Sequence, residues 1–326
     1  MSFVSDILLK SVENYVIFTG DVIVHYTVPG NVTLTSASIE LVTSAPERVV
    51  IALSLGTGTV TGETGELRYR CGFIDTPGTY HFRLLSSDST STSTVVARSR
   101  DLHATWPRIH LRLPQEHKTL EGFVNMPVTL VDDVRCRPEN SSVEFAINLQ
   151  VSSDESFEAS RLRLRSTLSD LQQAASAAIT LACSAFDVAG WYRVTLVSSS
   201  DEESPIAVSN TMDVTWSLDY RISPSRSSVF ACDQDTGLPI AYTQPTCPGS
   251  NDKIRLYKQV LLQSGYSRVY MSEQRALRGG LQVSFPCSDF DINAYGYCFI
   301  YRSFAENEQI FDQDEVCVRT RDAPGW

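Results

Sequence analysis

The sequence predicts an all-β protein made of three tandem β-sandwich domains. Two observations lead to this prediction: one segment pattern occurs three times at a nearly constant spacing, and apolar residues recur at every second position. The chain has 326 residues, of which 42% are hydrophobic and 20% are charged. A chain of this length and composition has enough apolar residues for two or three domains with sizeable cores.

The repeat is clearest around three cysteines. The segment CSAFDVAGWYRVTLVSS begins at Cys183. It resembles the segment CGFIDTPGTYHFRLLSS, which begins at Cys71, and the segment CSDFDINAYGYCFIYRS, which begins at Cys287. An alternating apolar segment precedes each copy, so each copy is expected to follow a strand.

Two further features repeat at the same spacing. The residues around Trp106 resemble those around Trp216, and the residues that follow Cys136 resemble those that follow Cys247. A chance repeat would not reproduce several features at one period. We therefore expect three domains and a short C-terminal linker, at residues 1–106, 107–217, 218–320 and 321–326.

Short segments with apolar residues at alternate positions predict the strands, and clusters of Pro, Gly, Ser and Asp separate them. These segments are residues 21–28, 31–42, 108–113, 143–151, 192–197 and 253–262. About seven strands in a unit of about 105 residues are typical of a β-sandwich. Residues 166–178 are the one stretch with a helical pattern, and a loop between two strands is the alternative.

Each repeat also carries a turn of the type Asp-x-Gly-x-Tyr, which joins strand E to strand F in immunoglobulin-like domains. We expect Tyr80 and Tyr192 to form the tyrosine corner of this turn, and Tyr297 lies in a looser match. The usual strand-F cysteine is replaced by Phe82 and Val194. We therefore expect immunoglobulin-like sandwiches whose cysteine lies on strand E and which lack the ordinary inter-sheet disulfide.

The eight cysteines include no C-x-x-C pair, which argues against a zinc ribbon or a thioredoxin-type site. The repeat predicts the disulfides Cys136–Cys183 and Cys247–Cys287, and Cys298 on strand F is expected to bond to Cys317 on the adjacent strand G. Cys71 and Cys232 are left unassigned. Cys71 is expected to be a buried free thiol, and pairing across units or across chains is the alternative.

Composition and motifs exclude several functions. A net charge of -11 argues against a nucleic-acid partner, and no stretch of 18 apolar residues is present to span a membrane. Neither a Gly-x-Ser-x-Gly elbow nor a histidine companion for Cys183 and Asp187 is present, so we expect no enzymatic activity. The five histidines lack metal-binding spacing.

Three loop-like segments also fail as ligand sites. The Gly-rich stretch at residues 56–62 precedes a strand rather than the helix that a phosphate cradle needs. The stretch at residues 233–237 begins like a calcium loop, but Gln244 stands where a bidentate acid is required. Residues 312–315 are expected to be an acidic turn. We expect neither a cofactor nor a bound metal.

The cysteines and two glycosylation sequons indicate an extracellular setting. The sequons begin at Asn31 and Asn140. The first residues lack the basic, apolar and small-residue regions of a signal peptide. We therefore expect an extracellular or secreted chain whose signal peptide is not part of this sequence.

Trp106 and Trp216 stand at the two domain junctions, where we expect them to pack between domains. Pro107 stiffens the first junction. Such short junctions predict a semi-rigid rod.

Several stretches carry a family resemblance: GELRYRCGFIDTPGTYHFRL, TWPRIHLRL, EGFVNMPVTL, VRCRP, YGYCFIYRS and EVCV. With the distribution of one, two and five cysteines over the units, the chain resembles the extracellular region of the thrombospondin type-1 domain-containing protein 1 family. The final RDAPGW resembles the start of a thrombospondin type-1 repeat, whose first tryptophan would be Trp326. The resemblance implies a single-pass membrane glycoprotein that takes part in cell adhesion, attached to the membrane only through a segment outside this sequence.

We therefore expect a non-enzymatic cell-surface adhesion or receptor ectodomain that binds protein or extracellular-matrix ligands. The alternative is a carbohydrate-binding or accessory β-sandwich region of a secreted protein, which predicts exposed Trp or Tyr platforms. A third class, an intracellular tandem scaffold, would keep all eight cysteines reduced.

Overall fold

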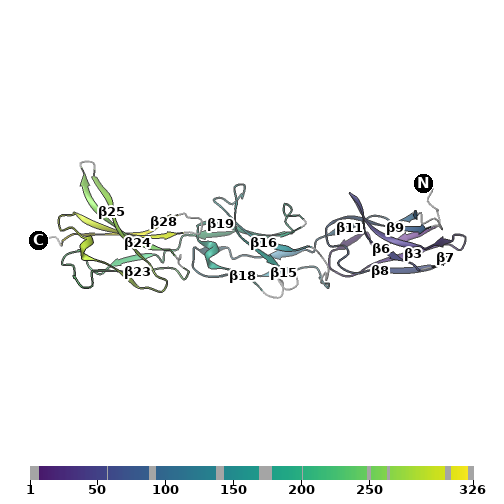
Figure 1. Cartoon of the computed structure of the whole chain (residues 1–326), viewed down its shortest axis with the longest axis horizontal. Helices are drawn as coiled ribbons and strands as arrows, with labels where there is room; N and C mark the ends of the chain where they lie inside the picture. The colour runs from purple at the N-terminus through teal and green to yellow at the C-terminus, as the bar shows by residue number, and fades with distance from the viewer. Residues whose placement is uncertain are drawn as a thin grey trace.

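Three β-sandwiches follow one another along the long axis of the molecule, with the two termini at opposite ends (Figure 1). The computed structural model describes residues 7–56, 58–87, 93–136, 143–168, 178–199, 201–247, 251–262, 265–304 and 310–321. Within these ranges the regular structure is β-strand, apart from two short 3-10 helices. The chain is therefore an all-β protein, as the sequence predicts.

The first sandwich contains strands β1 to β11: β1 (Leu8–Lys10), β2 (Asn14–Val16), β3 (Val22–Thr27), β4 (Leu34–Thr35), β5 (Ser38–Ser44), β6 (Glu47–Ser54), β7 (Thr59–Val60), β8 (Thr64–Tyr69), β9 (Gly78–Ser87), β10 (Ser93–Arg98) and β11 (Leu102–Thr105). One sheet has the order β1-β3-β8, and the other has the order β2-β11-β9-β5-β6. Strand β2 runs parallel to β11. The rings of Tyr69 and Phe82 meet across the core, with centroids 4.9 Å apart.

The second sandwich contains strands β12 to β21 and one 3-10 helix: β12 (Ile109–Leu111), β13 (Glu116–Lys118), β14 (Val124–Met126), β15 (Val128–Leu130), β16 (Phe145–Ser152), β17 (Arg161–Leu168), β18 (Ile179–Leu181), η1 (Cys183–Phe186), β19 (Gly190–Ser198), β20 (Ala207–Val208) and β21 (Met212–Thr215). Its larger sheet has the order β13-β21-β19-β16-β17. Strand β13 runs parallel to β21. This is the same edge arrangement as β2 and β11, so the two sandwiches repeat one topology.

The third sandwich contains strands β22 to β28 and a second 3-10 helix: β22 (Arg221–Pro224), β23 (Leu238–Thr243), β24 (Lys253–Leu262), β25 (Gly265–Arg275), β26 (Gln282–Phe285), η2 (Cys287–Asp289), β27 (Gly296–Phe304) and β28 (Ile310–Arg319). Its sheets have the orders β22-β23-β26 and β25-β24-β27-β28. The β24–β25 hairpin stands out from the long axis of the molecule (Figure 1).

Three sequence expectations about local structure are wrong. The first three residues of the expected helix at 166–178 belong to β17, because β16 supplies backbone partners for them; residues 169–177 lie outside the described residues. The acidic stretch at 312–315 belongs to β28 rather than to a turn, because β27 supplies backbone partners for it. The repeated cysteines follow strand E instead of lying on it, and Cys183 and Cys287 begin the two 3-10 helices.

The three corner tyrosines all bond back to the backbone. Their hydroxyls donate hydrogen bonds to carbonyl oxygens four to six residues upstream: Tyr80 to Thr76 (2.9 Å), Tyr192 to Val188 (2.8 Å) and Tyr297 to Asp291 (3.2 Å). Burial raises the pKa of the Tyr192 hydroxyl, so this group stays protonated and keeps donating. The bond holds the connection between strands E and F against strand F in each sandwich.

The aspartate of the second corner motif is a buried charge. Asp187 forms an ion pair with Arg163 of β17, and each side chain is only 6% exposed. The pair ties the corner of the second sandwich to its edge strand.

The second corner motif needs a glycine at position 190, because the backbone conformation and the close neighbours there leave no room for a side chain. Its φ is +152°, and a Cβ at this position would lie 2.7 Å from the carbonyl oxygen of Ser152. Gly190→Ala is therefore expected to lower the free energy of unfolding by about 1–3 kcal/mol, measured by chemical denaturation. Gly78→Ala is the matched control, since Gly78 has φ +153° but an added Cβ would meet nothing closer than 3.8 Å. Equal losses in the two variants would show that the contact with Ser152 is unimportant.

Candidate functional site: the disulfide-locked junctions

The cysteines form four disulfides, and two of these join neighbouring sandwiches. The pairs are Cys71–Cys136, Cys183–Cys247, Cys232–Cys287 and Cys298–Cys317, which leaves no free cysteine. The first pair connects the first sandwich to the second, and the second pair connects the second sandwich to the third. The predicted pairs Cys136–Cys183 and Cys247–Cys287 are therefore wrong, and so is the expected free thiol at Cys71.

The physical reason is the position of each cysteine along the rod. Cys136 contacts Phe18 of the first sandwich, whereas Cys183 packs with Leu120 against residues of the third sandwich. Cys136 and Cys183 thus lie at opposite ends of the second sandwich and cannot meet. Cys71 and Cys183, which follow strand E in the first two sandwiches, bond to the next sandwich instead.

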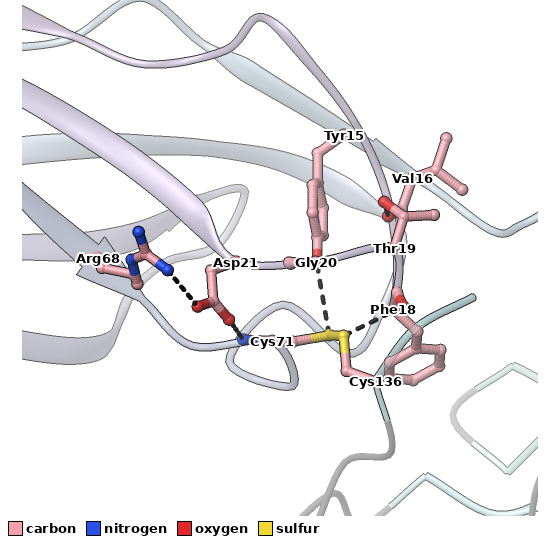
Figure 2. Close-up of a disulfide and its surroundings, with 9 residues drawn as sticks. All are labelled: Tyr15, Val16, Phe18, Thr19, Gly20, Asp21, Arg68, Cys71 and Cys136. Atoms are coloured by element: carbon pink, nitrogen blue, oxygen red, sulfur yellow. Dashed lines mark hydrogen bonds and ion pairs between the residues drawn. A yellow bond between two sulfur atoms is a disulfide. The ribbon is translucent and has the colours of Figure 1, made fainter. Parts of the chain in front are cut away.

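The backbone carbonyl of Phe18 connects the two sandwiches at the first junction (Figure 2). The oxygen of Phe18 accepts hydrogen bonds from the backbone N–H groups of Arg135 (3.0 Å) and Cys136 (3.1 Å), both in the second sandwich. Phe18 has φ +67°, an uncommon conformation for a residue with a side chain. This conformation turns the Phe18 carbonyl toward the neighbouring sandwich while the ring stays buried, with 2% exposed.

The first-sandwich side of this disulfide is held by polar contacts (Figure 2). The carboxylate of Asp21 accepts a hydrogen bond of 2.9 Å from the Cys71 N–H and lies 3.7 Å from the guanidinium of Arg68. The hydroxyl of Tyr15 donates to the Gly20 carbonyl (2.7 Å). Burial raises the pKa of Tyr15 to about 12. The Asp21 carboxylate thus holds the Cys71 backbone, and the Tyr15 hydroxyl holds the neighbouring turn at Gly20.

Aromatic rings fill the first junction beside the disulfide. The Trp106 ring lies 6.3 Å from the ring of Phe18 and 5.7 Å from the ring of Phe145, which belongs to the second sandwich. Phe18 and Phe145 also meet edge to face at 6.3 Å. The buried apolar residues of the first two sandwiches consequently form one continuous cluster. Trp106 therefore lies between domains, where the sequence places it.

The second junction repeats the first with different side chains. Leu120 has φ +58° and is 6% exposed. Its carbonyl accepts a hydrogen bond of 3.0 Å from the Cys247 N–H, and its own N–H donates to the carbonyl of Phe186 (3.0 Å). Leu120 thus has the role that Phe18 has at the first junction. Trp216 packs on Phe311 of the third sandwich at 4.7 Å but stays 37% exposed.

In the third sandwich the repeated cysteine forms a disulfide within its own domain. Cys287 corresponds in the repeat to Cys71 and Cys183, yet it bonds to Cys232 of its own sandwich. Cys298 and Cys317 stand directly opposite each other on β27 and β28 and form the fourth disulfide, which is the pair expected from the sequence. The interdomain lock therefore stops at the third sandwich.

The described residues contain one cluster of possible metal ligands. Cys298, Glu315 and Cys317 are the group whose ligand atoms lie close enough for a metal, but both sulfurs are in a disulfide and are not thiolates. The histidines do not gather: His103 lies near Thr79 (3.3 Å), while His117 packs against Phe186 with ring centroids 5.2 Å apart. Burial lowers the pKa of His117.

The remaining sequence-derived sites differ in how far the structure describes them. Asn31 lies in an exposed turn of the first sandwich, where a glycan has room. Asn140 and Trp326 lie outside the described residues. No helix in the described part of the chain is long and apolar enough to cross a membrane.

Residues 222–321 match the family model of the THSD1 third Ig-like domain. The third sandwich is therefore similar to this Ig-like domain. This match confirms the resemblance to the thrombospondin type-1 domain-containing protein 1 family that the sequence indicates. Ig-like domains of the THSD1 type have the fold of adhesion-type extracellular modules. Their disulfides fit an extracellular setting. Such domains are typically not enzymes.

Solved structures also align over almost the whole chain. They include the FN1–FN3 domains of chicken CNTN1 (10% identity, 97% of this chain and 98% of that chain, TM-score 0.26) and a marsupial T cell receptor (9%, 96% and 98%, 0.35). Domains A168–A170 of titin align at 11% identity over 97% and 98%, with a TM-score of 0.28. TM-scores this low do not identify a relative. No curated protein matches the chain.

Proposed function

We propose that this chain is a non-enzymatic adhesion or receptor ectodomain, displayed on the outer side of the plasma membrane or secreted, that binds a protein or matrix ligand. The observation that supports this function best is the pair of interdomain disulfides, Cys71–Cys136 and Cys183–Cys247. Domains joined by a chain alone move relative to each other by default. A covalent bond at each junction makes the three sandwiches a stiff spacer, which holds a binding surface at a fixed distance and orientation.

The proposal is tested with the oxidised chain, produced through a secretory pathway and coupled to beads. Beads carrying the chain are expected to bind saturably to cell-derived extracellular matrix or to cell monolayers, and heat-denatured chain is the control. Protease treatment of the matrix should abolish the binding, while glycosidase treatment should leave it in place. Beads that bind neither surface would contradict the proposal.

A second candidate function, carbohydrate binding, is supported by a cleft between the second and third sandwiches. Trp216, Leu218 and Phe311 line its apolar side, and the cavity has a volume of about 520 Å³. Its polar side carries the Arg302–Asp312 ion pair and the amide of Gln313. Since the ion pair is neutral as a unit, a neutral sugar ring would pack on the aromatic side and exchange hydrogen bonds with the rim.

Trp216→Ala is expected to abolish glycan binding if this second candidate is correct. The measurement is binding of the fluorescently labelled chain to an array of neutral glycans, because a single array separates many ring stereochemistries. Val208→Ala is the matched control, since Val208 is also exposed on the second sandwich, away from the cleft. An array without any bound glycan, or equal binding by wild type and Trp216→Ala, would rule out carbohydrate binding at this cleft.

A further inference from the structure

Strand β25 forms an open edge of the third sandwich. It is 11 residues long and stands at the end of the sheet order β25-β24-β27-β28. In the part of the chain that the structure describes, β24 is its partner on one side and no strand pairs with the other. An edge strand of this length presents backbone N–H and C=O groups that another strand can pair with.

The side chains of β25 do little to prevent such pairing. Tyr266, Val269 and Tyr270 are 56%, 48% and 50% exposed. The corresponding edge strand of the second sandwich, β17, instead carries three arginines within five residues, at 161, 163 and 165. Charged residues on an edge strand are a common protection against pairing. The edge strand of the third sandwich thus mixes exposed apolar side chains with charges of both signs, whereas the charges on β17 are all positive.

The edge also projects beyond the sandwich. Strand β24 pairs with β27 only from Lys253 to Gln259, whereas it pairs with β25 up to Leu262. The hairpin therefore extends past the sheet, and Figure 1 shows it standing away from the rod. At this end the Tyr266 ring packs on Tyr295 with centroids 4.8 Å apart, while the backbone edge of β25 has no strand partner among the described residues.

A bulge places the charged side chains of β25 on one face. Leu256 pairs with Ser272 and Tyr257 pairs with Tyr270, so Met271 is an extra residue. An extra residue reverses which face the following residues occupy. Consistent with this, Arg255 of β24 contacts both sides of the bulge: its guanidinium lies over the Tyr270 ring (5.8 Å) and its Nε lies 2.8 Å from Glu273.

These positions make the edge complementary to itself. In an antiparallel pair of two β25 strands related by a two-fold axis beside Met271, Arg268 of each copy stands opposite Glu273 of the other. In the same register Tyr266 of each copy stands opposite Arg275 of the other. Opposite charges and a cation facing an aromatic ring both stabilise cross-strand pairs. A shift of two residues would instead set Arg268 against Arg275, and parallel pairing would set Arg268 beside itself.

We propose that β25 is the interface through which two copies of this chain pair edge to edge, in the antiparallel register that sets Arg268 against Glu273. The side chain of Arg268 is 47% exposed and that of Glu273 is 24% exposed, so both carry open surface for a partner. Within the chain Arg268 pairs with Glu315 of β28, and Glu273 pairs with Lys253 and Arg255 of β24, so the second copy would share these charges with the existing partners. The dimer joins two rods at their third sandwiches into one continuous sheet. This inference is independent of the ligand of the proposed function.

Oligomeric state is the first measurement. The oxidised chain is expected to show a concentration-dependent monomer–dimer equilibrium in sedimentation equilibrium. Arg268→Glu should raise the dissociation constant at least tenfold, because it replaces two attractive pairs with two repulsive ones. Arg161→Glu on the edge of the second sandwich is the control and should change nothing. A chain that stays monomeric up to about 100 µM would overturn the proposal.

Cross-linking tests the register. Ser267 and Gln274 face each other across the same two-fold axis, so chains with Ser267→Cys mixed with chains with Gln274→Cys are expected to form a disulfide-linked heterodimer under mild oxidation. Chains with Ser267→Cys mixed with Ser272→Cys, two residues out of register, should not. Mapping the four native disulfides by mass spectrometry confirms that each variant is folded. Equal cross-linking of both mixtures would reject the register.

Discussion

Replacing both Cys71 and Cys136 with serine is expected to turn the stiff joint between the first two sandwiches into a hinge. The disulfide closes a sequence separation of 65 residues. Chain-entropy arguments assign a loop of this length about 4 kcal/mol of stabilisation, through the unfolded state. In the folded state the same bond fixes the second sandwich at the Phe18 carbonyl. Without it, the junction depends on two backbone hydrogen bonds and on the Trp106 ring contacts.

Small-angle X-ray scattering measures this change directly. The wild-type chain should scatter as one extended particle, and the double-serine variant should fit only a broad range of maximum dimensions, with a lower midpoint in chemical denaturation. The control is Cys298→Ser/Cys317→Ser, which removes a disulfide inside the third sandwich and should leave the rod shape unchanged. Scattering of the junction variant that is indistinguishable from wild type would show that the aromatic contacts alone hold the joint.

The sequence repeat predicts which cysteines are equivalent but does not decide which of them bond to each other. The repeat identifies Cys71, Cys183 and Cys287 as equivalent, and likewise Cys136 and Cys247. Equivalence does not say whether a cysteine bonds within its own unit or to the next one, since both schemes use equivalent positions. Pairing to the next unit gives separations of 65 and 64 residues and lets every cysteine pair, whereas pairing within units leaves two unpaired. The fact that every cysteine finds a partner is the feature of the sequence that favours the observed pairing between units.

Other features of the junctions leave no signal in the sequence. Phe18 and Leu120 are 102 residues apart, off the spacing of the cysteine repeat, and nothing in a Phe or a Leu indicates a positive φ. Tertiary contacts impose that conformation, because each carbonyl must reach the neighbouring sandwich. The strands are different: alternation of apolar residues is a local property, and for this reason residues 253–262 coincide with β24.

Tertiary pairing also overrides local composition in β28. Asp312 and Asp314 are residues that disfavour strands, and the sequence accordingly predicts a turn there. In the structure β27 pairs with this segment, and Arg302 of β27 lies 2.5 Å from Asp312. An opposite charge across the strand pair compensates for the low propensity, and only the fold reveals that Arg302 is the neighbour.

Asp187→Asn is expected to destabilise the second sandwich by about 3–5 kcal/mol, because it leaves the buried Arg163 guanidinium without its counter-charge. Asparagine keeps the shape of the side chain, so the loss reports on charge. Chemical denaturation followed by tryptophan fluorescence measures it. The matched control is Glu202→Gln, which removes the partner of Arg165 two positions along the same strand. That pair is exposed, and there the hydrogen bond from Arg165 lowers the pKa of Glu202, so solvent can replace the interaction at little cost.

A second variant separates charge from packing at the same site. Arg163→Met/Asp187→Leu removes both charges and is expected to recover most of the stability lost by Asp187→Asn, since paired apolar side chains avoid the desolvation of two ions. Equal destabilisation by both variants would show that shape, not charge, is what the site requires. Asp187 directly follows η1, whose Phe186 carbonyl binds the Leu120 N–H at the second junction. Loss of the pair should therefore loosen the Cys183–Cys247 junction as well as the corner, and hydrogen exchange of the Leu120 and Cys247 amides would detect it.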